Sequence, residues 1–281
     1  MAALLADSRL RRGLRGGIDL IYADLPFDPV RPGDAARPRR DTTALATHLA
    51  AIVPRLCLMR ELLANTGSIY VRPGRCAAPY VKLVLDELFG RDCGINDIVW
   101  TVAPEEAAGR QRFATAHEVL FFYRKNADVA IWNDVFQGAR AGSRDPGEAG
   151  SPEEMPRVRC RDVWSDIDAT GTGAGESPSR RPDALLERIV SASSTAGALV
   201  ADFTAGSGAT AIAAARLGRR WIACEADRMA CADARRRLIV EGAGPFLRSS
   251  LSRVRVAGGA GASLRSCRLF PADRRWPAGG A

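Results

Sequence analysis

The sequence predicts an α/β fold, in which a mostly parallel β-sheet carries helices on both faces. Short apolar segments rich in β-branched and aromatic residues alternate with longer segments whose apolar residues recur at helical spacing. Of the 281 residues, 47% are hydrophobic and 26% charged, which is ordinary for a globular domain with a sizeable core.

The first half of the chain supplies four expected strands and two expected helices. The strands are 18–22, 68–71, 95–100 and 118–123. The helices are 45–63, which Pro54 should kink or split, and 80–89, which should end at Gly90.

The second half begins with a stretch from 134 to 182 that is rich in Gly, Pro and Ser and has little periodicity. Helices and strands then alternate up to residue 240, and the tail after Gly242 again lacks a pattern. We expect helix 183–191, strand 198–202, helix 209–217, strand 221–224 and helix 227–240.

Charge and composition set limits on the partners. The formal net charge is +8, which suits a polyanion, although Lys82 and Lys125 are the only lysines, so codon bias toward arginine explains the charge equally well.

No apolar run reaches membrane-spanning length. Positive charge follows the apolar start (1–6) instead of preceding it, so we expect no export signal and a cytoplasmic protein. The cysteines form no C-x-x-C pair, and no metal site is expected.

A nucleoside-cofactor site is predicted at Asp202–Thr210, between a strand and a helix. Gly206 and Gly208 allow the backbone to approach a ligand, and the helix start offers free N–H groups. Glu225 ends the next strand, where a carboxylate can accept hydrogen bonds from ribose hydroxyls. The alternatives are a plain strand–helix turn and a dinucleotide fold, for which the chain that follows is too short.

Asp24-Leu-Pro-Phe27 follows the first buried strand, at the edge of the sheet where parallel α/β folds bind ligands. The carboxylate can accept hydrogen bonds from an exocyclic base amine, and the aromatic ring can stack on an extruded base. A plain strand-exit turn is the alternative.

These two motifs resemble those of the DNA amino-methyltransferases, namely [DNS]-P-P-[YFW] and D-P-F-x-G-S-G-T-T. Their order along the chain is similar to that of the beta class of this family. Further segments resemble the family in the same order: Thr66–Tyr70, Tyr80–Phe89, Asn96–Trp100, His117–Tyr123, Asp162–Asp166, Pro182–Val190 and Leu217–Ile222.

The resemblance implies a Rossmann-like, S-adenosylmethionine-dependent methyltransferase fold that acts on DNA without a metal, in a restriction-modification setting. It assigns Asp24, Pro26 and Phe27 to the target base, and Asp in the first position favours adenine N6 over cytosine N4. It assigns Asp202, Thr204, Gly206, Gly208 and Glu225 to S-adenosylmethionine.

The resemblance also divides the chain. Residues 1–133 are expected to form the catalytic-motif half, 134–182 a shortened target-recognition region, 183–241 the cofactor-binding half and 242–281 a loosely ordered tail. Departures from the family motifs, such as Leu25 in place of proline, leave two alternatives open. One is a non-catalytic relative that binds DNA or a methyltransferase partner, and the other is an RNA or protein amine methyltransferase. A homodimer or a partner subunit is also expected.

Overall fold

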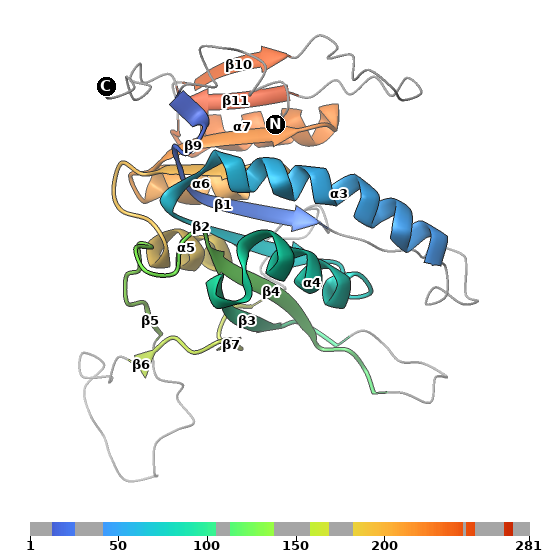
Figure 1. The fold of residues 1–281 in the computed structure, drawn as a ribbon. Helices are drawn as coiled ribbons and strands as arrows, with labels where there is room; N and C mark the ends of the chain where they lie inside the picture. Colours follow the sequence, from blue (N-terminus) through green and yellow to red (C-terminus); the bar gives the residue numbers. More distant parts are fainter. Residues whose placement is uncertain are drawn as a thin grey trace.

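The computed structural model describes residues 13–25, 42–104, 113–137, 158–168, 182–243, 246–250 and 267–271. A nine-stranded sheet lies between two layers of helices (Figure 1). Its strand order is β10-β11-β9-β8-β1-β2-β4-β3-β7. The bounds are β1 (Ile18–Leu25), β2 (Leu63–Pro73), β3 (Gly94–Thr101), β4 (His117–Arg124), β7 (Val163–Trp164), β8 (Leu199–Asp202), β9 (Arg220–Glu225), β10 (Phe246–Ser250) and β11 (Cys267–Pro271).

The remaining elements are five helices, a short 3-10 turn and a two-stranded ribbon within the described residues. The helices are α3 (Thr42–Leu62), α4 (Ala78–Phe89), α5 (Asp183–Ala192), α6 (Ala209–Arg216) and α7 (Arg228–Val240). The turn is η2 (Arg91–Cys93), and the ribbon pairs β5 (Phe136–Gln137) with β6 (Val158–Arg159).

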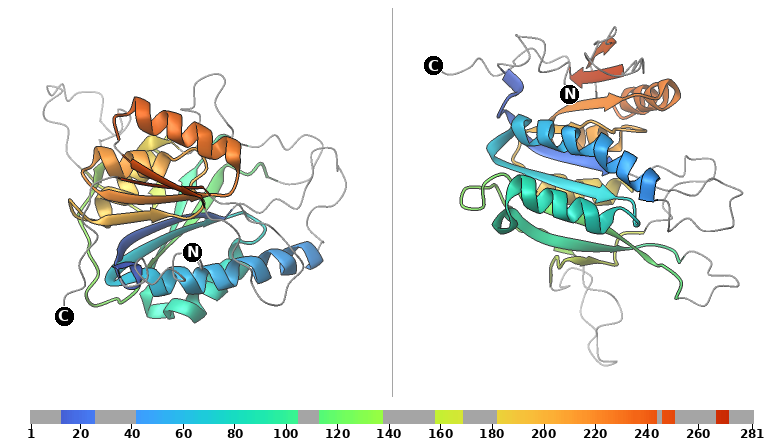
Figure 2. Two further views of the ribbon diagram at one scale, coloured as in Figure 1. Left: turned by 90° about the horizontal axis from the view of Figure 1, so that it is seen from above. Right: turned by 45° about the vertical axis from the view of Figure 1, so that its right-hand side comes forward.

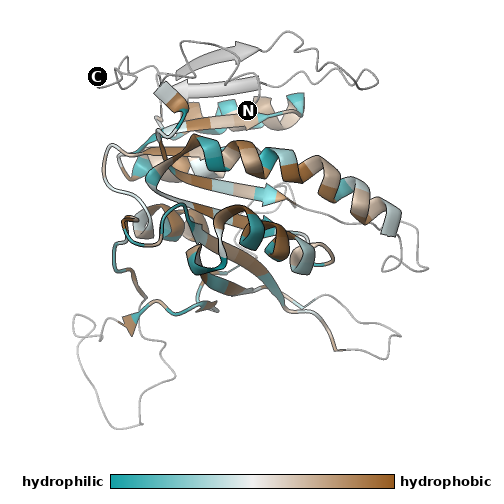
Figure 3. Cartoon of the chain, in the orientation of Figure 1, coloured by the Kyte–Doolittle hydropathy of each residue, from teal (hydrophilic) through white to brown (hydrophobic). Residues whose placement is uncertain are grey.

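Alternation along β1 divides the core between the two faces of the sheet. Leu20 and Tyr22 pack with α5, α6 and α7, whereas Ile21 and Ala23 pack with α3 and α4. The two helical layers are seen on opposite sides of the sheet in Figure 2. Hydrophobic and hydrophilic residues both occur around α3 and α4, as expected for helices with one face on a sheet (Figure 3).

The helices on both faces confirm the predicted fold class, but the sheet is more mixed than predicted. Strands β9, β8, β1 and β2 are parallel neighbours, while β4 is antiparallel to both β2 and β3. Strands β10 and β11, which lie in the tail, were not predicted; β11 pairs antiparallel with β9. The division into four regions stays a prediction.

Helix α3 is continuous across Pro54, so the predicted split is wrong, and the alternative of a kink stays a prediction. Pro54 lies on the exposed side of the helix, where water can satisfy the carbonyl group that proline leaves unbonded. Ile52, Leu56 and Met59 hold the opposite side against the sheet. Among the described helices, only α3 is long and apolar enough to cross a membrane, by length and composition alone.

The order in which successive strands are added to the sheet reverses between the parallel neighbours β1 and β8. From β1 the chain continues through α3 to β2 on one side, and from β8 it continues through α6 to β9 on the other. Such a switch point between parallel strands is where α/β sheets bind ligands. Asp24 and Asp202, the first residues of the two predicted motifs, therefore both lie at this switch point.

Candidate active site

Asp24 and Asp202 lie at the carboxyl ends of neighbouring parallel strands. Tyr22 pairs with Asp202 in the β1–β8 ladder, so Asp24 is two residues beyond that pair on the same face. Thr204 connects the two acids. Its Oγ1 accepts the Asp24 N–H at 3.0 Å and lies 3.2 Å from Asp202 Oδ1, to which it can donate. The structure thus brings the two predicted motifs into direct contact.

Asp202 is buried and held by hydrogen bonds. Its Oδ1 accepts the Thr204 N–H at 2.9 Å, and its Oδ2 accepts the Thr210 hydroxyl at 2.6 Å. Burial raises the pKa of Asp202 to about 7; the negative charge of Asp24 adds to the increase, and the hydrogen bonds oppose it. Asp202 therefore shapes the turn in addition to any role toward a ligand.

Glycine is favoured at the two positions of the turn for different structural reasons. Both have positive φ, +50° at Gly206 and +80° at Gly208. A Cβ on Gly208 would lie 3.0 Å from the Ala234 Cβ of α7, whereas a Cβ on Gly206 would meet nothing within 4 Å. Gly208 therefore allows α6 to pack against α7, and Gly206 borders open space that a ligand can occupy.

Glu225, at the end of β9, lies directly beside this turn. Its carboxylate accepts hydrogen bonds from the backbone N–H groups of Gly206 (2.7 Å), Ala226 (2.6 Å) and Asp227 (2.8 Å). Asp227 in turn caps α7 by accepting from Met229 N and Ala230 N. The predicted cofactor residues Asp202, Thr204, Gly206, Gly208 and Glu225 are thus gathered around one turn.

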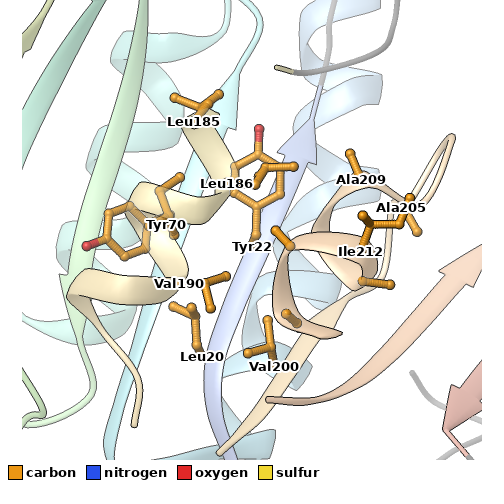
Figure 4. Close-up of a cluster of buried hydrophobic side chains, with 14 of the residues drawn as sticks. Leu20, Tyr22, Tyr70, Leu185, Leu186, Val190, Val200, Ala205, Ala209 and Ile212 are labelled. Carbon is orange, nitrogen blue, oxygen red and sulfur yellow. The ribbon is translucent and has the colours of Figure 1, made fainter. Parts of the chain in front are cut away.

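A buried hydroxyl points toward the same edge. Tyr22 is almost fully buried, and its hydroxyl has no hydrogen-bond partner among the described residues. It points toward the carboxyl end of β1, with Leu186 and Ala209 on either side (Figure 4). Burial raises its pKa well above the ordinary value, so the group remains a donor. A buried donor and the open space at Gly206 both fit a polar ligand at this edge.

A charged cluster that was not predicted from the sequence lies beside Asp24. Arg72, which pairs with Asp24 in the β1–β2 ladder, donates from Nε to Asp24 Oδ1 at 2.9 Å, and its Nη2 forms an ion pair with the same oxygen at 2.6 Å. Its Nη1 donates to Glu118 Oε2 at 2.7 Å. Burial raises the pKa of Asp24 to about 6, and Arg72 opposes that increase. The only available signal was a charged residue at the end of the apolar segment 68–71.

Pro26 and Phe27 lie outside the described residues, so their assignment to the base stays a prediction. A cavity of about 310 Å³ opens at the same edge of the sheet, past the ends of β3 and β7. It is lined by Thr101, Val102, Ala103, Ser165, Asp166, Ile167 and Asp168.

Comparison with protein families decides which family this arrangement belongs to. The family model for N6/N4 DNA methylases matches residues 18–236, which include β1 with Asp24, the Asp202–Thr210 turn and Glu225. The chain belongs to the N6/N4 DNA methylase family. The predicted resemblance is therefore confirmed.

Two curated relatives of this family are type II methyltransferases. The chain is 40% identical to M2.DpnII of Streptococcus pneumoniae over 190 residues, covering 66% of this chain and 65% of that protein. It is 33% identical to M.EcaI of Enterobacter cloacae over 118 residues, covering 41% of this chain and 26% of that protein. The chain thus spans less than two thirds of the length of either relative.

Solved structures share the fold. The cytosine-N4-specific PvuII DNA methyltransferase superimposes with a TM-score of 0.56 at 15% identity, covering 79% of each chain. The complex of M1.HpyAVI with S-adenosylmethionine gives a TM-score of 0.52 at 18% identity, covering 84% of this chain and 95% of that chain. These likenesses confirm the Rossmann-like methyltransferase fold.

Proposed function

We propose that this member of the N6/N4 DNA methylase family transfers a methyl group from S-adenosylmethionine to an exocyclic amine of a DNA base, with adenine N6 as the target. One observation carries the proposal: Thr204 hydrogen-bonds the Asp24 backbone and lies within hydrogen-bond reach of the Asp202 carboxylate. A base-binding acid and a cofactor-binding turn are thereby held together at the switch point of the sheet.

The residues at the turn suit S-adenosylmethionine. Glu225 can accept from a ribose hydroxyl, since a carboxylate has about four acceptor positions and three backbone N–H groups use three of them. The Tyr22 hydroxyl and the open space at Gly206 suit the methionine end. The cofactor supplies an electrophilic methyl group on its sulfonium. A structural relative, M1.HpyAVI, has been solved with this cofactor.

Asp24 has the central role in the proposed mechanism. The lone pair of the base amine is delocalised into the ring, and an ionised carboxylate that accepts an amine hydrogen makes the nitrogen a better nucleophile. Bound S-adenosylmethionine would supply the methyl group to this nitrogen, and Asp24 would take up the proton that the nitrogen then releases. Pro26 and Phe27 would hold the other amine hydrogen and the ring. Because the site lies at a sheet edge within the protein, the base must leave the duplex.

The partner proposals follow from the family. DNA suits the net charge of +8, and a restriction-modification setting fits the type II relatives. A homodimer or a partner methyltransferase subunit, and a cytoplasmic location, stay predictions.

A methylation assay with matched variants tests the function. Purified protein is mixed with labelled S-adenosylmethionine and duplex DNA, and the DNA is digested to nucleosides to identify the methylated base. Asp24→Asn should reduce transfer by about a hundredfold or more while cofactor affinity, measured by calorimetry, is kept. Asp19→Asn is the control: Asp19 lies near the opposite end of β1, where it accepts from Leu199 N at 2.7 Å.

The alternatives give different results in the same assay. Cofactor or DNA binding without any transfer would identify the non-catalytic relative. Transfer to RNA or protein in preference to DNA would identify the other amine methyltransferase. Undiminished transfer by Asp24→Asn would rule out the proposed mechanism.

A further inference from the structure

One face of the sheet carries charged residues where its apolar core ends. On β1, β2 and β4 the buried residues Tyr22, Tyr70 and Leu120 lie on the face covered by α5 and α6. Two positions further toward the carboxyl edge, the same alternation places Asp24, Arg72 and Glu118. Three neighbouring strands therefore present an acid, a base and an acid at the site: Asp24 lies directly across from Arg72, and Glu118 lies diagonally from it.

Arg72 is the centre of this cluster and is nearly inaccessible to solvent. Its side chain is 6% exposed, compared with 14% for Asp24 and 32% for Glu118. Interaction with both acids raises the pKa of Arg72, against the effect of burial, so the guanidinium is always charged. A buried cation needs such partners, because removing it from water is costly unless its donors are satisfied.

The hydrogen bonds fix the orientation of the Asp24 carboxylate. The hydrogen bond from Arg72 Nε and the ion pair with Nη2 both involve Oδ1, so rotating the carboxylate would break both contacts. The bond from Nη1 to Glu118 Oε2 keeps the guanidinium plane in place. A planar guanidinium held at two ends restricts its partner more than a lysine ammonium would.

The charges around Asp24 give Arg72 an electrostatic role as well. The acids Asp202 on β8 and Glu118 on β4 face the same edge, as does the hydroxyl of Tyr22. Burial and neighbouring negative charge both favour the neutral form of a carboxyl group. Arg72 hydrogen-bonds Asp24 and opposes the effect of burial on its pKa.

We propose that Arg72 is a positioning residue for methyl transfer: anchored by Glu118, its guanidinium holds Asp24 as an ionised and oriented acceptor for the target amine. This inference rests on the proposed function. Arg72 itself does not contact the base or the cofactor in this proposal, and it acts only through Asp24.

The test is the pH dependence of methyl transfer under single-turnover conditions in Arg72→Met, Arg72→Lys and Glu118→Gln. The wild-type rate should fall as pH decreases through the Asp24 pKa of about 6. In Arg72→Met this fall, the acid limb of the profile, should move to higher pH by about one unit or more, so the rate at pH 7 drops by about twofold or more and recovers at alkaline pH. Arg72→Lys should give an intermediate displacement of the limb, and Glu118→Gln a smaller loss of rate.

Arg216→Met is the matched control. Arg216 hydrogen-bonds Asp183, Glu187 and Glu241 at the end of α6 that is away from Gly208. Its loss removes an ion network of similar size without touching Asp24, so the acid limb should stay in place. An acid limb in Arg72→Met that coincides with wild type, in a folded protein that binds cofactor, would overturn the inference. If Arg72→Met does not fold, the acid limb of Arg72→Lys is compared with that of wild type instead, and coincidence of the two would overturn the inference.

A second readout separates the two proposals. The carbon-13 resonance of the Asp24 carboxyl, assigned with Asp24→Asn, reports its titration directly and needs no activity. If wild type transfers no methyl group but the Asp24 titration still moves upward in Arg72→Met, the proposed function is wrong and Arg72 does hold Asp24 ionised. If wild type is active and the titration does not move, the role of Arg72 is wrong.

Discussion

The backbone N–H of Asp24 donates a hydrogen bond to the Thr204 hydroxyl at 3.0 Å, although the two residues are 180 positions apart. The same oxygen lies 3.2 Å from Asp202 Oδ1. Since a hydroxyl accepts and donates at once, Thr204 can bond both strand ends with a single atom. The relative position of Asp24 and the Asp202–Thr210 turn therefore depends on this side chain as well as on the pairing of β1 with β8.

Replacing Thr204 tests this dependence. Thr204→Val keeps the shape of the side chain but removes both hydrogen bonds, leaving the Asp24 N–H without its acceptor. We expect unfolding free energy to fall by about 1–3 kcal/mol and methyl transfer to fall about tenfold or more. Chemical denaturation and the methylation assay measure the two effects.

Thr204→Ser is the control, because serine keeps the hydroxyl and should retain most of the stability and rate. Equal losses in the Ser and Val variants would show that the methyl group of Thr204, and not its hydroxyl, is what the site requires.

The parts of this site that sequence could predict are those carried by local patterns. The Asp202–Thr210 turn follows an apolar strand and precedes a helix, and Asp24 follows another apolar strand. Both could therefore be placed at strand ends without knowing which strands are neighbours. Their resemblance to known motifs supplied the expectation that they act together.

Arg72 could not be predicted because its role depends on strand pairing. It meets Asp24 only because β1 and β2 are parallel neighbours in a register that aligns these two residues, 48 positions apart. The β10–β11 pair was missed for a similar reason, since β11 pairs with β9, a strand far from it in sequence. The split expected at Pro54 does not occur, because the effect of proline depends on which side of α3 faces the sheet.

The two glycines of the turn should respond differently to alanine. Gly208→Ala brings a Cβ to 3.0 Å from that of Ala234 and also strains a φ of +80°, so the chain should lose stability. Gly206→Ala meets no neighbour and should lose only about 1–2 kcal/mol from its positive φ. Because its Cβ would enter the proposed cofactor space, however, cofactor affinity should fall.

Thermal unfolding and calorimetric titration with S-adenosylmethionine separate these effects. Gly208→Ala should show the larger fall in unfolding temperature, and Gly206→Ala the greater loss of affinity relative to its loss of stability. Unchanged cofactor affinity in Gly206→Ala would remove that space from the proposed cofactor site.

Glu225 is expected to contribute to cofactor affinity through the ribose. Glu225→Gln keeps the size of the side chain but exchanges one acceptor oxygen for a donor. We expect the free energy of S-adenosylmethionine binding to weaken by about 1–3 kcal/mol, because the ribose hydroxyl loses the acceptor that the Glu225 carboxylate provides. Calorimetry measures this, and Asp233→Asn on the exposed side of α7 serves as the control. A Glu225→Gln affinity equal to that of the control would exclude the ribose contact.

The last prediction concerns the pH dependence of stability at Asp202. Burial raises its pKa from 3.8 to about 7, so the folded chain keeps a proton that the unfolded chain loses above about pH 4. A raised folded pKa contributes stability that is present at low pH and is lost as pH rises through about 7. A tenfold change in proton affinity corresponds to about 1.4 kcal/mol, so the effect is on the order of a few kcal/mol.

Asp202→Asn removes this titration while keeping an acceptor for Thr204, and its amide can donate to the Thr210 hydroxyl. The variant should therefore gain stability relative to wild type as pH increases from about 4 to about 7. Urea denaturation at several pH values measures the difference. Asp24 titrates in both proteins, so its contribution to the pH dependence of stability cancels when its pKa is the same in both. A stability difference that stays constant across this range would show that Asp202 is ionised in the folded chain throughout, held by its hydrogen bonds against the effect of burial.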